Sequence, residues 1–213
     1  MVHKLSSPLF TCQRLSLDGH TCYSSYRCRI IRLSLTLKGE MKFVNYFFKG
    51  VFFMFATAKA AYQLLEELNI SYQRVDHQPI TSVKNVPFTL PGPQVKNLVL
   101  KPRKGEHRFL VILPDEKQAD LTSLAKTLNE KRLSFVSEKN LVELLNVPAG
   151  TVTPLALPND YDHKITVVID KDIDQQDTVG FHPNINSTTL IMQFRDFEKI
   201  LNHLGYKPLY VAI

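Results

Sequence analysis

Apolar residues recur along much of the chain with the spacing of amphipathic helices. The first stripe occupies positions i, i+3, i+4 and i+7 of a helix predicted over residues 58–68, and consists of Ala61, Leu64, Leu65 and Leu68. Thr57 is placed to cap this helix, because its hydroxyl can accept a hydrogen bond from a free backbone N–H of the first turn. Comparable patterns predict a helix after the cap Asp120, another over residues 138–145, and a third around Phe197 that stops at Gly205.

Short runs rich in Val, Ile, Leu and Phe predict β-strands between these helices. They cover residues 72–75, 95–100, 108–113, 133–136, 165–169, 178–181, 188–192 and 209–213. Lys104-Gly105 predicts a hairpin between the second and third runs, while residues 77–93 and 148–158 are predicted to be loops. Helices and strands are interspersed, with hairpins among them. We therefore expect an α/β mixed (α+β) fold, in which flanking helices pack on a mixed β-sheet.

Charge and cysteine content divide the chain near residue 53. Residues 1–53 contain eight Lys and Arg and two acids, which accounts for the whole formal net charge of +6. Residues 54–213, which we predict to be a single domain, are formally neutral, so a nucleic-acid surface there must come from local clustering. All three cysteines lie before residue 54. A domain without cysteine owes nothing to oxidation, which fits a cytoplasmic protein.

The first 53 residues show no lasting period of 2 or 3.6, and we predict a leader that is disordered or part of an over-extended gene start. Three interpretations are open: a functional leader, a signal peptide that begins at Met41 and is cut near Ala56-Thr57-Ala58, or translation that begins at Met41 or Met54. Lys49 interrupts the apolar region, and the cleavage site would fall at the head of a helix, which favours the third. No run of about 18 apolar residues exists, so no transmembrane helix is expected.

Familiar catalytic signatures are absent from the sequence. It has no Gly-x-Gly-x-x-Gly, no Walker loop, no His-Glu-x-x-His and no Gly-x-Ser-x-Gly. The acidic run Asp170, Asp172, Asp174 and Asp177 lacks the glycine and the distant Glu of a calcium loop, and is interpreted as a solvated turn. The cysteine spacing matches no zinc pattern. We expect neither a metal nor a cofactor.

Lys96-Asn97 begins an apolar strand after a Pro-Gly-Pro loop. A lysine in this place can hold its ammonium at the mouth of a cleft, where it would bind a phosphate or a developing negative charge. The alternative is a solvated lysine at the edge of a sheet, since lysine is almost always exposed.

Two loops carry further polar groups. In Gly150-Thr151-Val152-Thr153-Pro154, glycine allows close backbone approach and consecutive N–H groups can line an anion site, although an ordinary turn is the alternative. In the segment 180–189, His182 and the amides of Asn184 and Asn186 supply donors and acceptors near neutral pH. A polar hairpin that caps its own backbone would look the same.

The order of these pieces resembles the YbaK/ProX family, specifically its free-standing branch of ProX-type Ala-tRNA(Pro) deacylases. The resemblance covers residues 54–213, and the leader has no counterpart. It is carried by Lys96-Asn97-Leu98, Phe109-Leu110-Val111-Ile112-Leu113-Pro114, Leu133-Ser134-Phe135, Gly150-Thr151-Val152-Thr153-Pro154, and Gly180-Phe181-His182-Pro183-Asn184 with Asn186.

The resemblance implies a YbaK/ProRS-editing-like domain and an aminoacyl-tRNA hydrolase that acts in trans on mischarged tRNA(Pro), with Ala-tRNA(Pro) as the expected substrate. It implies that Lys96 is the essential catalytic residue and that water, helped by the terminal ribose hydroxyl, attacks the ester. The implied partners are the 3′ end of mischarged tRNA(Pro) and prolyl-tRNA synthetase, and no membrane. The residues implied to bind the aminoacyl-adenosine end are Asn97, Gly150, Thr151, Val152, Thr153, His182 and Asn186.

Three positions depart from the family pattern. Val95 stands where Thr is usual, and Leu155 and Ala156 stand where Phe-Gly is usual. Ala156 could restrict a backbone approach that glycine allows. Cysteine on tRNA(Pro) is therefore an alternative substrate. A non-catalytic editing-like module that binds tRNA or the synthetase is the competing class, because fold does not fix function.

Overall fold

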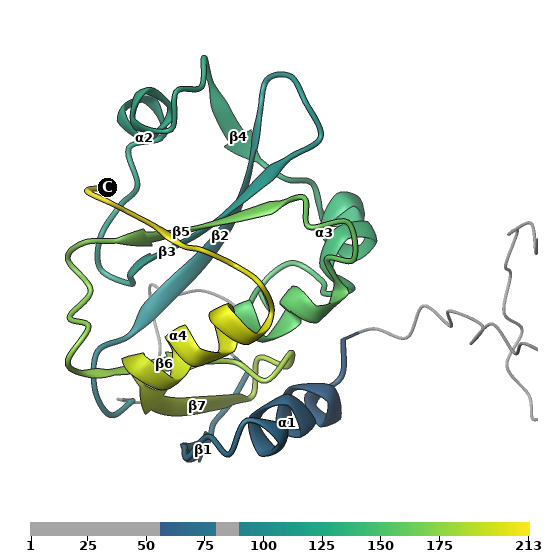
Figure 1. Ribbon diagram of the computed structural model, residues 1–213, viewed down its shortest axis with the longest axis vertical. Helices are drawn as coiled ribbons and strands as arrows, with labels where there is room; N and C mark the ends of the chain where they lie inside the picture. Colours follow the sequence, from purple (N-terminus) through teal and green to yellow (C-terminus); the bar gives the residue numbers. More distant parts are fainter. Residues whose placement is uncertain (1–55, 80–89) are drawn as a thin grey trace, which may run out of the picture. The chain divides into compact units, whose positions relative to one another are not determined.

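The computed structural model describes residues 56–79 and 90–213. The predictions for residues 1–53, for a start at Met54 and for residues 80–89 of the first loop lie outside the described residues. The helices are α1 (Ala58–Glu67), α2 (Leu121–Thr127), α3 (Glu138–Leu145), the 3₁₀ helix η2 (Pro154–Asn159) and α4 (Phe194–His203). The strands are β1 (Gln73–Asp76), β2 (Val95–Pro102), β3 (Arg108–Pro114), β4 (Leu133–Phe135), β5 (Ile165–Asp170), β6 (Thr178–Phe181), β7 (Thr188–Gln193) and β8 (Leu209–Val211) (Figure 1).

The strands form two sheets, whereas the sequence predicted one. A three-stranded antiparallel sheet has the order β1-β7-β6, and a five-stranded sheet has the order β4-β2-β3-β5-β8. The larger sheet is mixed, because β2 runs antiparallel to β3 and β4 while β5 runs parallel to β3 and β8. The predicted hairpin at Lys104-Gly105 is confirmed as the turn between β2 and β3. The mixed α+β class is therefore confirmed, with its strands divided between two sheets.

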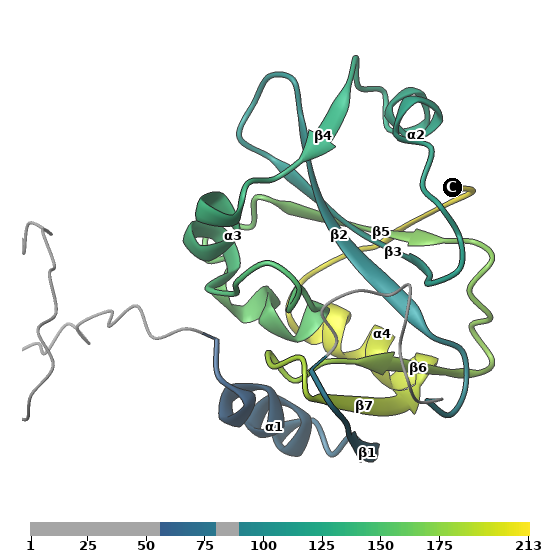
Figure 2. The same cartoon turned by 180° about the vertical axis from the view of Figure 1, so that it is seen from behind.

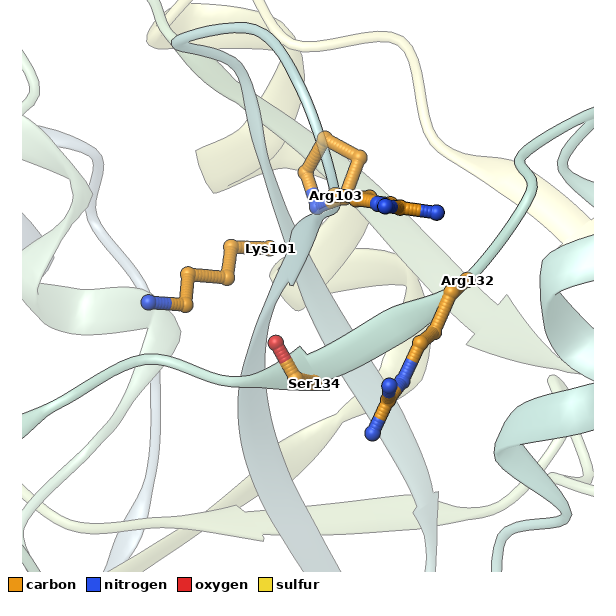
Figure 3. A pocket seen from close by; sticks show the side chains of 5 residues that line it. Lys101, Arg103, Arg132 and Ser134 are labelled. Atoms are coloured by element: carbon orange, nitrogen blue, oxygen red, sulfur yellow. The ribbon is translucent and has the colours of Figure 1, made fainter.

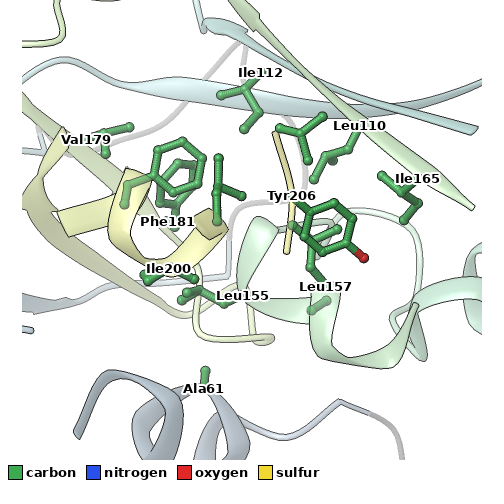
Figure 4. Packing of buried hydrophobic residues seen from close by; sticks show 14 of the residues in the cluster. Ala61, Leu110, Ile112, Leu155, Leu157, Ile165, Val179, Phe181, Ile200 and Tyr206 are labelled. Atoms are coloured by element: carbon green, nitrogen blue, oxygen red, sulfur yellow. The ribbon is translucent and has the colours of Figure 1, made fainter. Parts of the chain in front are cut away.

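Both faces of the larger sheet are covered. Leu110 and Ile112 of β3 pack into the main core, while Phe109, Val111 and Leu113 pack into a smaller core against α2. This alternation follows from the period of two along a strand. Burial on both faces explains why β3 reads as a continuous apolar run. Figure 4 shows the main core, where residues from both sheets meet residues of α1, η2 and α4.

Local capping rules account for the helix ends. The Thr57 hydroxyl accepts a hydrogen bond from the N–H of Ala60 at 3.2 Å, and the Asp120 carboxylate accepts from Thr122 and Ser123. The predicted apolar stripe of the last helix began at Phe197, but helix α4 begins at Phe194. Phe194 lies one turn earlier and is buried on the same face. None of the helices in the described part of the chain is long and apolar enough to span a membrane.

Two loop predictions need correction. Residues 148–158 were predicted to be loop only, but η2 begins inside this segment, with the Thr153 hydroxyl as its cap. The acidic run that begins at Asp170 was predicted to be a solvated turn, but Asp170 is the last residue of β5 and is fully buried. The Lys117 ammonium lies 2.8 Å from its carboxylate, and this ion pair compensates the buried charge.

The two ends of β2 lie in different surroundings. Its start lies near β6 and β7, with α1 and β1 beyond them, and its far end pairs with β4 near α2 (Figure 2). The Cα of Gly180 in β6 approaches Gln94, the residue before β2, so that a Cβ added there would meet the Gln94 Oε1 at 3.5 Å. The segment before β2 is therefore the point where the two sheets come together, and Lys96 and Asn97 lie next to it.

Candidate active site

Lys96 lies half-buried as the second residue of β2. Its ammonium donates a hydrogen bond to the backbone carbonyl of Asp115 at 2.8 Å, just past the end of β3. A lysine ammonium carries three N–H groups, so this contact occupies one of them. No carboxylate pairs with Lys96 within 4.0 Å in the described residues. The cation therefore keeps donor capacity for a substrate oxygen.

Two carboxyl groups lie near the Lys96 charge. Burial raises the pKa of the Asp115 carboxyl, its hydrogen bond with Glu116 raises it further, and the Lys96 charge opposes both. Hydrogen bonds from its own backbone and from Asp115 lower the pKa of Glu116, and Lys96 contributes in the same direction. The start of β2 thus places one ammonium beside an acidic pair on the neighbouring turn.

Asn97 joins β2 to the predicted glycine loop. Its Nδ2 donates to the carbonyl of Val152 at 3.1 Å, across 55 residues of sequence. Its Oδ1 is buried and has no hydrogen-bond partner among the residues that the structure describes. An unpaired buried acceptor costs about 1–3 kcal/mol, so such an atom is a natural partner for a donor on a ligand. The structure thus brings together Asn97 and Val152, two of the residues implied to bind the substrate, and their role in binding stays a prediction.

Alternation along β2 directs Lys96 and Asn97 to opposite faces of the strand. Val95 and Val99, two residues to either side of Asn97, pack with the main core, and Leu98, two residues beyond Lys96, packs with the smaller one. Sequence adjacency alone therefore does not bring the ammonium and the amide to one point. Lys96 is, however, the second residue of the strand, and its stem is long and flexible. The position of its ammonium is therefore less fixed by the strand face than that of the short Asn97 side chain.

The loop over residues 150–153 is built mainly as a turn. Gly150 has φ +83°, a conformation that strains any residue with a side chain, and an added Cβ would meet no atom within 4 Å. Glycine is thus required here by the turn and not by a close neighbour. Both the N–H and the hydroxyl of Thr151 donate to the carbonyl of Pro148, so they are not available to line an anion site. Thr153 is fully buried as the cap of η2.

His182 directly follows β6 and faces the β6–β7 turn. Its Nδ1 lies 2.9 Å from the carbonyl of Thr188, which can only accept, so Nδ1 carries the proton and Nε2 is the basic nitrogen. Burial lowers the pKa of His182, the hydrogen bond to Thr188 opposes this, and the nearby His77 lowers it further. His182 is therefore a neutral imidazole with an acceptor nitrogen at physiological pH.

His77 was not predicted to be a site residue. Its ring centroid lies 5.9 Å from that of His182, and its Nε2 lies 2.9 Å from the Thr189 hydroxyl. The pairing of β1 with β7, with Asp76 opposite Thr188, brings these two histidines together. More than a hundred residues separate them, and no local pattern marks such a pair.

The turn between β6 and β7 contains the two predicted amides. Asn184 has φ +61° and is buried, and its Nδ2 donates to the carbonyl of Thr57 at 3.0 Å, which ties this turn to the start of α1. Asn186 lies half-buried in the same turn.

Among the candidate site residues, the structure shows Asn97 and Val152 in contact and His182 beside His77. It shows no hydrogen bond or ion pair between Lys96 and His182. In the described residues there is also no group of three His, Cys, Asp or Glu side chains that could hold a metal ion.

Comparison with known proteins identifies the kind of domain. Residues 81–200 match the sequence profile described as the aminoacyl-tRNA editing domain. The chain is 33% identical over 149 residues to the prolyl-tRNA editing protein ProX of Acetoanaerobium sticklandii, covering 66% of this chain and 88% of that protein. It is 33% identical over 154 residues to prolyl-tRNA synthetase associated domain-containing protein 1 of Xenopus laevis, covering 69% of this chain and 91% of that one.

Solved structures agree on the fold. A crystallised protein described as a candidate trans-editing enzyme for prolyl-tRNA synthetase superposes with a TM-score of 0.54 at 16% identity, covering 73% of this chain and 96% of that chain. The hypothetical protein APE2540 superposes with a TM-score of 0.56 at 18% identity, covering 71% and 98%. At these identities the likeness concerns the fold alone.

Proposed function

The chain belongs to the aminoacyl-tRNA editing domain family, and we propose that it hydrolyses alanine from mischarged tRNA(Pro) in trans. The general activity, deacylation of an aminoacyl-tRNA, is that of its relative, the prolyl-tRNA editing protein of Acetoanaerobium sticklandii. The choice of alanine as the amino acid is our proposal.

The buried, unpaired Oδ1 of Asn97 is the observation that supports a ligand site here most directly. The α-amino group of an aminoacyl ester is a donor of the kind this acceptor lacks. No acidic residue lies in the 150–153 loop. In this proposal an amide oxygen binds the substrate amine, so binding does not depend on a buried carboxylate. The Val152 carbonyl, which the Asn97 amide holds at 3.1 Å, would form the adjoining wall.

Lys96 would stabilise the negative charge that develops during the reaction. The oxygen of a water molecule attacks the ester carbonyl carbon, and the carbonyl oxygen becomes an oxyanion. The bond to the terminal ribose oxygen then breaks, that oxygen takes a proton, and free amino acid and tRNA are released. The two uncommitted N–H groups of Lys96 are suited to the oxyanion, since donors fixed before the reaction stabilise charge at little reorganisation cost.

His182 would act as a hydrogen-bond acceptor for the terminal adenosine. Its Nδ1 is committed to the Thr188 carbonyl, which leaves Nε2 with a lone pair. A neutral imidazole can accept from a ribose hydroxyl, whereas an imidazolium cannot. The walls around the site would include Asn186, Thr151 and Thr153. The hydroxyls of Thr151 and Thr153 hold the loop in place through hydrogen bonds with its backbone.

Size exclusion explains why such an enzyme would remove alanine and not proline. A synthetase pocket made for proline cannot strongly reject a smaller side chain, because lost methylenes discriminate by only about 1–3 kcal/mol. A second pocket too small for proline uses steric repulsion, which can discriminate more sharply. Leu155 and Ala156 are buried in η2, and Val95 packs against the main core. All three departures from the family pattern therefore act on the packing next to the loop. Cysteine on tRNA(Pro) is the alternative substrate.

The partners follow from the same proposal. The substrate is the 3′ end of tRNA(Pro) in the cytoplasm, and association with prolyl-tRNA synthetase would deliver it. A pull-down with purified synthetase tests that association separately from catalysis.

The deciding experiment is hydrolysis of a panel of tRNA(Pro) molecules charged with glycine, alanine, serine, cysteine or proline by the purified protein. We expect alanine to be released fastest and proline to be retained. Rapid release of proline would contradict the editing function, because the enzyme would then destroy the correct product. Binding of tRNA(Pro) without hydrolysis of any ester would instead identify a non-catalytic module.

A further inference from the structure

A polar pocket of about 410 Å³ lies at the far end of β2, away from the predicted site residues. Its walls come from the end of β2 with the residue after it, and from β4 with the residue before it. Figure 3 shows Lys101 and Arg103 extending in opposite directions near the end of β2, and Arg132 beside Ser134 of β4. The lining residues are Lys101, Pro102, Arg103, Arg132 and Ser134. Three of the five are cations, and none is acidic.

The three cations are not neutralised within the described part of the chain. No ion pair or side-chain hydrogen bond involves Lys101, Arg103 or Arg132 there. The two acids nearest in sequence already have partners: Glu106 lies 3.3 Å from the Lys164 ammonium, and Glu130 lies 2.9 Å from His107. A domain whose formal charge balances thus concentrates positive charge at this point.

The pocket shares a strand face with the Asn97 side of the candidate active site. Asn97, Val99 and Lys101 alternate onto one face of β2, and Val99 packs in the main core. Lys101 is paired in register with Ser134 of β4, so both side chains stand on that face. Four residues of strand, at about 3.3 Å each, separate Asn97 from Lys101 by roughly 13 Å. An RNA strand whose end is held at Asn97 would therefore place a backbone phosphate of the nucleotides before that end within reach of Lys101.

We propose that this basic pocket binds backbone phosphates of the tRNA acceptor strand, next to the aminoacylated end held at Asn97. The assignment rests on the proposed function, which supplies the RNA substrate. Arginine forks suit phosphate, because their parallel N–H groups bind two oxygens at once. The Ser134 hydroxyl adds a neutral donor. Phosphate contacts fix position and register without reading sequence, so the pocket orients tRNA without selecting tRNA(Pro).

The test compares a pocket variant with a matched control on two substrates. The pocket variant is Arg103→Ala/Arg132→Ala, and the control, Arg195→Ala/Lys207→Ala, removes the same charge from exposed positions on α4 and before β8. Each enzyme is assayed on alanyl-tRNA(Pro) and on alanyl-adenosine, which carries no phosphate. We expect kcat/KM on the tRNA to fall about tenfold for each guanidinium removed. The rate on alanyl-adenosine should remain within about twofold of wild type, because this substrate makes no phosphate contact to lose.

Salt dependence provides an independent readout. Each lost phosphate contact lowers the slope of log affinity against log salt by about one, so the slope for tRNA should fall by about two in the pocket variant and much less in the control. Arg103→Lys/Arg132→Lys keeps the charge and should restore most of the slope. Inorganic phosphate serves as a competitor, and at equal ionic strength it should displace tRNA from the wild-type protein more effectively than chloride does. If phosphate displaced tRNA from the pocket variant equally well, its site would lie elsewhere and the assignment would be wrong.

The outcomes separate this inference from the proposed function. If the wild-type enzyme is active and the pocket variant matches the control on tRNA, or loses equally on alanyl-adenosine, the inference fails and the function stands. If the wild-type enzyme hydrolyses no ester, fluorescence anisotropy with uncharged tRNA(Pro) still decides. Weaker binding by the pocket variant than by the control supports the pocket, and equal binding overturns it.

Discussion

Removal of the Lys96 ammonium is the most informative perturbation of the candidate active site. Lys96→Met keeps most of the apolar stem and deletes the charged group, while Lys96→Ala removes both. One of the three N–H groups donates to the Asp115 carbonyl at 2.8 Å, which leaves two for the oxyanion. Loss of an oxyanion donor costs about 2.7–4 kcal/mol in known enzymes, or about 10²–10³ in kcat. We expect both variants to lose catalysis by this factor.

The same substitution should affect folding only slightly. The lost hydrogen bond joins a half-buried ammonium to one carbonyl, which is worth about 1.5 kcal/mol, the low end for a charged donor. For a domain of this size, such a change shifts the Tm by about 3–6 °C. Activity and stability therefore respond on different scales, and the difference separates a catalytic role from a structural one.

Single-turnover deacylation of alanyl-tRNA(Pro), together with thermal unfolding, measures both effects. Lys126→Met, which changes an exposed lysine on α2, is the matched control and should behave as wild type. Lys96→Arg keeps a cation of different shape and should retain intermediate activity. If Lys96→Met keeps more than about a tenth of the wild-type rate, a loss below about 1.4 kcal/mol, then Lys96 is not the key group.

Three further predictions concern the boundary, the substrate and the pH response. A protein truncated to residues 54–213 should keep full activity and Tm; insolubility or a sharp drop in Tm would show that the leader packs on the domain. Among tRNA(Pro) esters, glycine and alanine should be released fastest, serine and cysteine more slowly and proline least, as competition assays can measure. Since burial lowers the pKa of His182, the unfolded chain binds this proton more readily. Stability should therefore fall as the pH drops below about 6.5, and His182→Gln should reduce that loss in unfolding scans from pH 8 to 5.

The positions of most elements could be predicted from the sequence because their causes are local. The Thr57 and Asp120 caps act over three residues, and the β2–β3 hairpin closes over a short turn. Apolar periodicity marks which side of an element is buried, and this suffices to place helices such as α1 and α4. The candidate residues Lys96, Asn97 and His182 were recognised through the order of motifs along the chain, and their individual roles stay predictions.

The tertiary structure decided which of these pieces meet. Periodicity shows that a face is buried but not what covers it, so the division into two sheets, the pairing of β1 with β7 and the approach of His77 to His182 had no local signal. Asp170 was predicted to be exposed because an acidic run is usually solvated, and only packing against β8 and the Lys117 ammonium made it a buried ion pair. The basic pocket is the same kind of result. Lys101, Arg103 and Arg132 are ordinary surface residues in a neutral domain until the pairing of β2 with β4 concentrates their charges, because electrostatic potential depends on distance in space and not on separation in sequence.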